Sequence, residues 1–368
     1  MKILIISQHL FPMTSPRAHR TTELLVELSK KGHDVTLYAV TGKHDYSIFE
    51  KQNKVKIKSI ELKFMSHPYN SDMDQKRLFI DKVLGRLFKK IEFPNIEFLY
   101  RIPKILKQDH EYDALITIAD PHQIHWGTAN FKKKYPHLFP KIWIADCGDP
   151  FMMNGYSNEH LPYFAKYEKL FCGACDFITV PIENAKQGYY PEFKKKIRVI
   201  PQGFNFELPL SKTDVSNSKL TFGFAGNFYD DIRNPELFLQ YLSQINMDFE
   251  FHVYSPFPNE IVKYKKILGE KLKIFKAINR VDLIESLKNM DFLVNIENKL
   301  SPTQIPSKLI DYAIANRPIL SIQPDKPNKT VIDEFFKKDY KNQYRELNIE
   351  QYHISNVANQ FIELIQKY

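Results

Sequence analysis

The sequence predicts an α/β protein built from two doubly wound domains with parallel sheets that face each other across a cleft. Short apolar runs, typical of strands buried on both faces, alternate with helical patterns along most of the chain. The chain has 368 residues, enough for two domains of ordinary size. A polar stretch at 209–219 separates two such series of strands and helices, and its composition is typical of a linker.

The first domain is expected over residues 1–208. Its strands are predicted where apolar residues run without a break, at Lys2–Ser7, Asp34–Val40, Ala114–Ala119, Lys141–Ala145, Phe177–Val180 and Lys196–Ile200. Leucines at helical spacing predict a helix over Thr21–Lys31, and Gly32 ends it. Strands joined through helices in this way form a parallel sheet.

The second domain is expected over residues 220–350. Its predicted strands are Leu220–Ala225, Phe249–Tyr254, Leu272–Phe275, Phe292–Ile296 and Pro318–Ile322. Its predicted helices are Pro235–Ile245, Val281–Asn289 and Ser307–Ala315. A last helix lies within Ile349–Tyr368, and its apolar face suits either domain. Residues 351–368 are therefore treated separately, with packing back on the first domain as one option.

The net charge and the cysteine content limit which kinds of partner and metal site are expected. Lys and Arg exceed Asp and Glu by 52 to 43, and this net charge of +9 favours anionic partners such as nucleotides, phospholipid headgroups or nucleic acid. No nucleic-acid-binding module is recognisable, so nucleic acid is not expected. The three cysteines fit reduced thiols of a cytoplasmic protein, and no metal site is expected. No apolar run reaches the ~18 residues of a membrane span.

One segment has the features of a phosphate-binding site. The patterns GxGxxG and GxxxxGK[ST] are absent, which argues against a dinucleotide dehydrogenase and a P-loop NTPase. Pro306 and Ser307 instead begin a helix after a predicted strand, so free backbone amides there favour an anion. Lys308 adds a charge, and Asp311 lies one turn further along the same face. The alternative is an ordinary capped helix with a surface ion pair.

Five motifs in a fixed order strengthen the phosphate interpretation. They are Gly32-His33, Ala145-Asp146-Cys147-Gly148-Asp149-Pro150-Phe151, Val199-Ile200-Pro201-Gln202-Gly203-Phe204-Asn205, Gly223-Phe224-Ala225-Gly226-Asn227-Phe228 followed by Arg233-Asn234-Pro235, and Pro306-Ser307-Lys308 through Asp311-Tyr312 with Arg317-Pro318-Ile319-Leu320. This series resembles glycosyltransferase family 4, whose members have the GT-B fold of two Rossmann-like domains. The resemblance covers nearly the whole chain.

The resemblance implies transfer of a sugar from a nucleotide donor with retention of configuration and without a catalytic metal. By motif position, Lys308 would hold the donor diphosphate together with Arg233, and Asp311 would hold the ribose. Cations at these places would stabilise the charge that develops on the leaving group.

Two donor-side positions depart from the family pattern. Asn227 stands where the family often carries Arg, and Thr303 stands where it carries a first carboxylate. The motif at Gly148 also lacks the family's Arg. The donor-side candidates are therefore Asn227, Arg233, Thr303, Pro306, Ser307, Lys308 and Asp311, and the resemblance gives Arg233 and Lys308 catalytic roles as well.

The acceptor side is expected at the strand ends of the first domain. Asp149 follows a strand, where a carboxylate suits a base or an anchor for a hydroxyl, or else caps the next turn. Asp120 and His122 follow the strand before it, and His122 is either a catalytic group or a plain loop residue. Arg17 and Arg20 are candidates for contacts with an anionic acceptor or with donor phosphates; the alternative is a solvated helix start.

Residues 78–91 form an amphipathic pattern with basic residues opposite the apolar ones. Such a helix can lie on an anionic membrane surface, or its apolar face can simply belong to the core. The sequence therefore predicts a cytoplasmic glycosyltransferase, with contact to the inner leaflet as an option. It would use a UDP-sugar and a glycan or lipid-linked acceptor. The alternatives are a nucleotide-sugar epimerase on the same fold and a catalytically weak subunit that binds a partner or a membrane.

Overall fold

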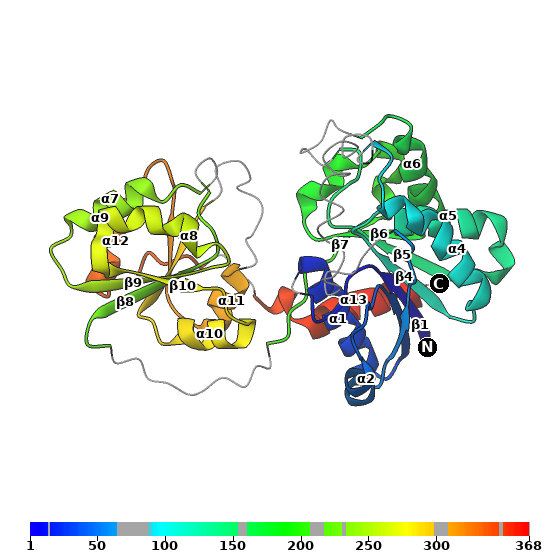
Figure 1. The fold of residues 1–368 in the computed structure, drawn as a ribbon, viewed down its shortest axis with the longest axis horizontal. Coiled ribbons are helices and arrows are strands. Elements are labelled where there is room, and N and C mark those ends of the chain that lie inside the picture. Colours follow the sequence, from blue (N-terminus) through cyan, green and yellow to red (C-terminus); the bar gives the residue numbers. More distant parts are fainter. Residues whose placement is uncertain are drawn as a thin grey trace. The chain divides into compact units, whose positions relative to one another are not determined.

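The structure is a computed structural model that describes residues 1–13, 15–64, 88, 90–153, 160–206, 217–229, 233–297, 308–345 and 349–367. The chain divides into two compact units (Figure 1). Unit 1 comprises Met1–Asn205 together with Gln351–Tyr368, and unit 2 comprises Phe206–Glu350. The last segment of the chain thus belongs to the unit that the first segment begins.

Unit 1 contains a seven-stranded parallel sheet with the order β3-β2-β1-β4-β5-β6-β7. The strands are β1 (Lys2–Ser7), β2 (Asp34–Ala39), β3 (Lys56–Ser59), β4 (Ala114–Ile118), β5 (Ile142–Asp146), β6 (Phe177–Val180) and β7 (Ile197–Val199). The residues of β4, β5 and β6 are all buried, because helices cover both faces of the sheet. The continuous apolar runs of the sequence reflect this double burial.

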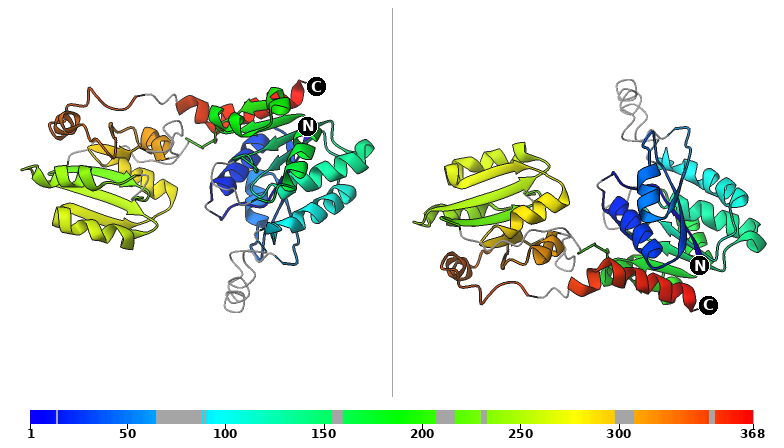
Figure 2. Two further views of the ribbon diagram at one scale, coloured as in Figure 1. Left: turned by 90° about the horizontal axis from the view of Figure 1, so that it is seen from above. Right: turned by 90° about the horizontal axis from the view of Figure 1, so that it is seen from below.

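The helices of unit 1 pack on the two faces in two groups. On one face lie α1 (Pro16–Lys30), α2 (Ser47–Asn53) and α13 (Ile354–Gln366), and on the other α4 (Phe98–Gln108), α5 (Gln123–Lys134) and α6 (Phe164–Ala174). In the described part of unit 1, the short 3-10 helices Asn95–Glu97, Pro136–Leu138, Glu183–Gly188 and Pro191–Lys196 lie in the connections. Figure 2 shows α13 running beside α1, with which it packs.

Unit 2 contains a five-stranded parallel sheet with the order β10-β9-β8-β11-β12. Its strands are β8 (Leu220–Ala225), β9 (Phe249–Ser255), β10 (Leu272–Lys276), β11 (Phe292–Ile296) and β12 (Ile319–Ile322). One face is covered by α7 (Glu236–Gln244), α8 (Pro258–Ile261), α9 (Lys265–Leu268) and α12 (Lys329–Phe336), and the other by α10 (Arg280–Lys288) and α11 (Lys308–Ala315). Among the described residues, unit 2 also has the 3-10 helices Val262–Tyr264 and Gly269–Lys271, and a further one, Ile349–Tyr352, spans the boundary with the last segment of unit 1.

The predicted fold class is confirmed, since both units are doubly wound parallel sheets. Helix α1 begins five residues earlier than expected because Ser15 caps it: the Ser15 hydroxyl oxygen accepts from the amide of Ala18 at 3.2 Å, and Pro16 occupies the first turn. Strand β3 and helix α12 were not expected. Strand β3 has only polar residues apart from one isoleucine, so it forms no apolar run.

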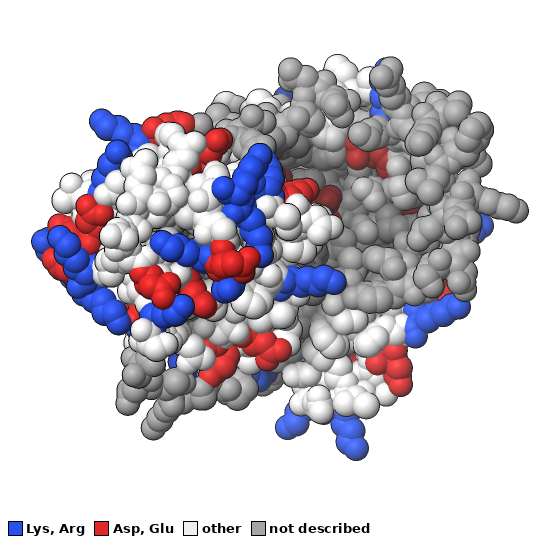
Figure 3. All heavy atoms as spheres, turned by 60° about the vertical axis from the view of Figure 1, so that its left-hand side comes forward, with Lys and Arg blue, Asp and Glu red and all other residues white. Residues whose placement is uncertain are grey.

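Several predicted features lie outside the described residues. They are the donor-side candidates Thr303, Pro306 and Ser307, residues 209–216 of the expected linker, and 78–87 with Lys89 of the amphipathic pattern. In the part of the chain that the structure describes, no helix is long and apolar enough to cross a membrane. Figure 3 shows Lys and Arg intermixed with Asp and Glu on the face of unit 2 that it presents.

Candidate functional site

Unit 2 places two cations at the carboxyl edge of its sheet. The Lys308 ammonium is buried at the start of α11, 4.1 Å from the centre of the Phe224 ring, and has no hydrogen-bond partner among the described residues. Burial, reinforced by the Arg233 guanidinium, lowers the pKa of Lys308 well below its usual value. Arg233 itself follows β8 and lies over the Tyr229 ring. A buried cation repelled by a second cation favours an anionic ligand.

Tyr312 fixes helix α11 against the strand ends. Its hydroxyl accepts from the amide of Ala225 at 2.8 Å and donates to the carbonyl of Val294 at 3.1 Å. Two adjacent strands, β8 and β11, are therefore tied to the helix that carries Lys308, and the side chain of Tyr312 is fully buried. The start of α11 is thus held in place by hydrogen bonds at the edge where ligands bind to such sheets.

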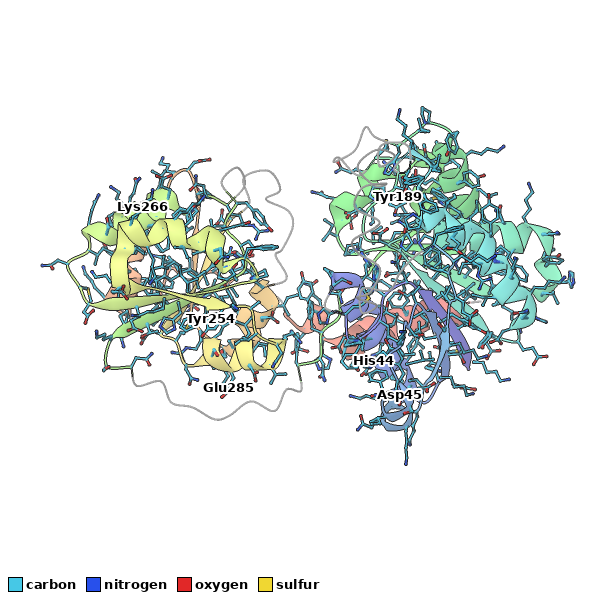
Figure 4. All side chains as sticks on the ribbon, in the orientation of Figure 1. His44, Asp45, Tyr189, Tyr254, Lys266 and Glu285 are labelled. Atoms are coloured by element: carbon cyan, nitrogen blue, oxygen red, sulfur yellow. The ribbon has the colours of Figure 1, made fainter. Side chains whose placement is uncertain are left out.

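Asn227 anchors the loop that follows β8. Its side-chain oxygen accepts from the Ser255 hydroxyl at 2.7 Å, and its amide donates to the Tyr229 hydroxyl at 3.2 Å. Gly226 before it has φ of +123°, a value that side chains rarely allow. Its amide donates to the carbonyl of Tyr254, labelled in Figure 4, at the end of β9. The loop therefore crosses close to the end of the neighbouring strand.

The Asp311 carboxylate is held by an ion pair. The Nε of Arg280, the first residue of α10, donates to it at 2.7 Å. The partner is thus not Lys308, although Lys308 lies one turn away on the same helix. The surface Lys–Asp pair that was the alternative for this segment does not form among the described residues.

Unit 1 has a cavity of about 610 Å³ at the carboxyl edge of its own sheet. Four of the five predicted N-domain residues line it: Arg17, Asp120, His122 and Asp149. These four residues come after β1, β4 and β5 in the sequence. As expected, they lie together beyond the carboxyl ends of these strands. Asp120 and Asp149 are exposed residues among those that line the cavity.

Arg17 crosses directly over Gly148. A Cβ at residue 148 would lie 2.0 Å from the Arg17 Nη2, so any larger residue there would require the guanidinium to move. Arg17 also donates to the Asp146 carboxylate at 3.3 Å. A guanidinium from α1 thus occupies the space beside position 148.

Arg20 does not reach the cavity, which corrects its assignment as a contact for a ligand. Its Nε and Nη2 bond both oxygens of Asp146 at 3.1 and 2.8 Å, and it also donates to the carbonyls of Ile200 and Pro201. Only 3% of the side chain is exposed. Arg20 is therefore a structural residue that joins α1, β5 and the end of β7, and the solvated alternative is also wrong.

His122 is held by the loop that follows β5. Its Nε2 donates to the carbonyl of Asp149 at 3.0 Å, since a carbonyl only accepts, and this leaves the proton off Nδ1. Nδ1 is buried without a partner among the described residues. Burial lowers the pKa of His122 to about 4, so the ring is neutral near pH 7. A neutral ring whose free nitrogen is buried is poorly placed to exchange a proton with a ligand.

Beneath His122 lies a buried chain of hydrogen bonds. Trp143 can only donate, so Thr117 accepts from it at 2.8 Å and gives its own proton to His125 Nδ1 at 2.8 Å. His125 Nε2–H then points at the Cys147 sulfur at 3.3 Å. Burial raises the pKa of Cys147, as it does for Tyr189 beside it (Figure 4).

Two side chains of this hydrogen-bond chain, together with His122, are also candidate metal ligands. One ligand atom each from His122, His125 and Cys147 lie within 4.8 Å of one another, so these side chains could hold a metal ion. A metal there would have to displace the His125 Nε2 proton and the Cys147 proton, both of which the hydrogen-bond chain holds in place.

Two cavity residues were missed by the sequence analysis. Glu92 and His160 line the cavity with Arg17, and a hydrogen bond of 2.9 Å joins Glu92 Oε1 to His160 Nδ1. Burial raises the pKa of Glu92, although its interactions with His160 and Gln123 oppose this. Neither residue follows a strand directly, and no motif contains them.

The sequence alone finds no relative: no protein-family model matches it, and no curated protein does. Solved structures match its fold. A glycosyltransferase from Rickettsia africae matches with a TM-score of 0.66 at 14% identity, covering 100% of this chain and 98% of its own. Alr3699/HepE from Anabaena, in complex with UDP and glucose, matches with a TM-score of 0.62 at 11% identity, with both chains fully covered.

A UDP-N-acetylglucosamine 2-epimerase also matches, with a TM-score of 0.56 at 12% identity, covering 99% of this chain and 94% of its own. The chain therefore has the GT-B fold, and proteins with transferase and epimerase names share it.

Proposed function

We propose that this protein is a glycosyltransferase that moves a sugar from a nucleotide-sugar donor to a hydroxyl group of a glycan or lipid-linked acceptor, as in the assembly of a surface polysaccharide or glycolipid. The observation that carries the proposal is the Lys308 ammonium, buried beside Arg233 without a hydrogen-bond partner among the described residues. A protein gains little by burying a lone cation, so the arrangement is best explained by an anion that binds there.

The donor diphosphate is the anion proposed for Lys308 and Arg233. When the bond between sugar and phosphate breaks, negative charge develops on the diphosphate, and fixed cations lower the energy of that state. Asp311, oriented by Arg280, accepts hydrogen bonds from the ribose hydroxyls in this proposal. Asn227, and Thr303 with Pro306 and Ser307, complete the donor side. No metal is required because the cations take the charge.

UDP is the proposed nucleotide. HepE was solved with UDP and glucose, and a second structure of the same fold was solved with UDP, which supports UDP over GDP. We propose retention of configuration on the resemblance to family 4. Proton NMR of the product distinguishes retention from inversion, because the two anomers differ in their coupling constants.

The acceptor is proposed to bind in the cavity of unit 1. Asp120 and Asp149 offer carboxylate oxygens to hydroxyl groups, and Arg17 offers a guanidinium. Residues 78–91 are proposed to contact an anionic membrane, and Ile91 at the end of that segment is exposed. Flotation with vesicles of phosphatidylglycerol, compared with phosphatidylcholine, tests this contact.

Thermal unfolding with UDP, GDP, CMP and their sugars tests the function without any knowledge of the acceptor. A ligand that binds only the folded protein stabilises it by about 2.7 kcal/mol at a hundred times its dissociation constant. We expect one nucleotide to raise the midpoint in the wild type and to do so much less in Lys308→Ala. No shift with any nucleotide would favour the partner-binding subunit.

The epimerase is the second candidate, because an epimerase shares the fold. An epimerase changes the sugar of its donor without an acceptor, whereas a transferase needs one. Incubation of the protein with UDP-sugars alone, followed by NMR of the sugar, separates the two.

A further inference from the structure

Phe11 presents an exposed ring from a backbone that is held in place. It follows β1, and 43% of the residue is exposed. Its amide donates to the Thr22 hydroxyl of α1 at 3.0 Å, and its carbonyl accepts from the Tyr46 hydroxyl at 2.6 Å. Both backbone polar groups of Phe11 are therefore fixed by neighbouring elements. A group that is already rigid loses little conformational freedom when a ligand contacts it.

Two more rings surround Phe11. The Phe49 ring of α2 stacks against it, with centroids 5.6 Å apart and planes at 16°, and the His44 ring lies nearly perpendicular to it, with centroids 5.9 Å apart. We call Phe11, His44 and Phe49 the aromatic platform. Figure 4 shows His44 beside Asp45 in the part of unit 1 that contains α2. Phe11 is thus part of a cluster and not an isolated apolar residue on the surface.

The aromatic platform adjoins the cavity of unit 1. His9, two residues before Phe11, lines that cavity, and so do residues 15–17 after it. The loop that carries Phe11 therefore starts and ends at the cavity wall. His44 follows β2, the strand that pairs with β1. Because the carboxyl ends of parallel strands share one edge of a sheet, the platform and the cavity are neighbours at that edge.

The surroundings of the rings favour a sugar over a lipid chain as the ligand. Lys43, His44 and Asp45 are all exposed, so polar side chains accompany the rings. A pyranose has a face of C–H groups and hydroxyls at its rim, so an aromatic face and polar neighbours suit it together. An acyl chain would instead take these polar groups out of water without giving them hydrogen bonds, which is unfavourable.

We propose that the aromatic platform binds the second sugar of an oligosaccharide acceptor whose terminal sugar occupies the cavity. The inference rests on the proposed function and narrows its acceptor to a chain of at least two sugars, free or lipid-linked. The apolar face of the second sugar stacks on Phe11, while Phe49 and His44 hold the ring in position. The platform contributes affinity for the acceptor and takes no part in the making or breaking of bonds.

Binding of the full chain to immobilised neutral glycans of one to four sugars, with UDP present, tests the proposal. We expect the wild type to bind a disaccharide more tightly than the corresponding monosaccharide. Phe11→Ala should weaken binding of the disaccharide about fivefold to tenfold, as loss of an aromatic contact does, and leave the monosaccharide unchanged. Phe11→Tyr keeps the ring and should restore most of the affinity.

Ile48→Ala is the matched control. Ile48 precedes Phe49 on α2 and is 70% exposed, but it has no ring. Its replacement should leave glycan binding unchanged. If Ile48→Ala loses as much binding as Phe11→Ala, the surface is a general apolar patch and the proposal is wrong. The proposal is also overturned if Phe11→Ala binds the disaccharide as the wild type does, or if the wild type binds no glycan or binds without regard to chain length.

Failure of the inference and failure of the proposed function give different results. Nucleotide binding is assigned to unit 2, so Phe11→Ala should keep the thermal stabilisation by UDP, which also shows that the variant is folded. If no nucleotide stabilises the wild type, the proposed function fails. If UDP stabilises the wild type but Phe11 can be replaced without loss of glycan binding, only the assignment of the aromatic platform fails.

Discussion

Replacement of Lys308 by methionine separates two effects of the buried ammonium: the loss of folding stability that it causes, and its proposed role in binding the donor diphosphate. Methionine keeps most of the volume and removes the charge, so Lys308→Met should be more stable than the wild type without ligand. An unpaired buried polar group costs about 1–3 kcal/mol, and more when charged. The contact with Phe224 returns about 0.5–2 kcal/mol. The net gain is therefore about 1 kcal/mol, which raises the unfolding midpoint by about 2–4 °C for a domain of this size.

The stability that Lys308→Met gains over the wild type should also depend on pH, and the lowered pKa of Lys308 sets the direction of this dependence. The pKa of Lys308 is lower in the folded protein than in the unfolded chain, where lysine titrates near about 10.4. Between the two values the unfolded chain binds the extra proton, so the stability of the wild type rises with pH. The advantage of Lys308→Met is thus complete below the folded-state pKa and disappears as the pH approaches the unfolded value.

Differential scanning calorimetry of both proteins, with and without UDP, measures these effects. Lys308→Met should gain stability alone and lose most of the stabilisation by UDP. Lys329→Met is the matched control, because Lys329 also lies over a ring, that of Tyr241, but is exposed. The reasoning is refuted if Lys308→Met unfolds at a lower temperature than the wild type, or if it responds to UDP as the wild type does.

Three further predictions concern stability, each measured by urea unfolding. Asp146→Asn removes the negative charge that pairs with the buried Arg20 and should cost about 3–5 kcal/mol at pH 7. Burial raises the pKa of Asp146, but its two guanidinium partners outweigh this and the pKa is lowered, so the difference should disappear as pH falls through the folded-state value. Tyr312→Phe should cost about 1–3 kcal/mol, because it leaves a buried amide and a buried carbonyl unpaired; an unchanged midpoint would contradict this. Gly127→Ala places a Cβ 2.8 Å from a carbonyl oxygen of α4 and should cost about 1–3 kcal/mol. Gly173→Ala, with its nearest atom at 3.8 Å, should instead be neutral or stabilising.

The fold was largely predictable because most strands are buried on both faces. Lys2–Ser7, Phe177–Val180 and Phe292–Ile296 have the predicted bounds, since their apolar runs end where burial ends. Lys56–Ser59 lies at the edge of its sheet beside β2, and none of its side chains is fully buried. Because an exposed edge strand does not need apolar residues, its sequence contains no apolar run. Propensity alone does not separate such a strand from a loop.

The candidate sites were predictable only where a residue directly follows a strand. Arg17, Asp120 and Asp149 share one cavity because the carboxyl ends of parallel strands lie at one edge. Glu92 and His160 are far in sequence from any strand end and meet through tertiary packing. The burial of Lys308 was not foreseen either, since a lysine in the first turn of a helix is usually solvated.

The position of α13 has a consequence for how the protein is made on the ribosome. Its apolar side chains, such as Val357 and Phe361, are fully buried in the core of unit 1, which otherwise ends at Asn205. That core therefore stays incomplete while all of unit 2 is translated, which at about 5–20 residues per second takes on the order of ten seconds. Unit 2 is complete in sequence earlier, so the segment made second can be the first to reach its native state, and chaperones are expected to meet an unfinished N-terminal unit.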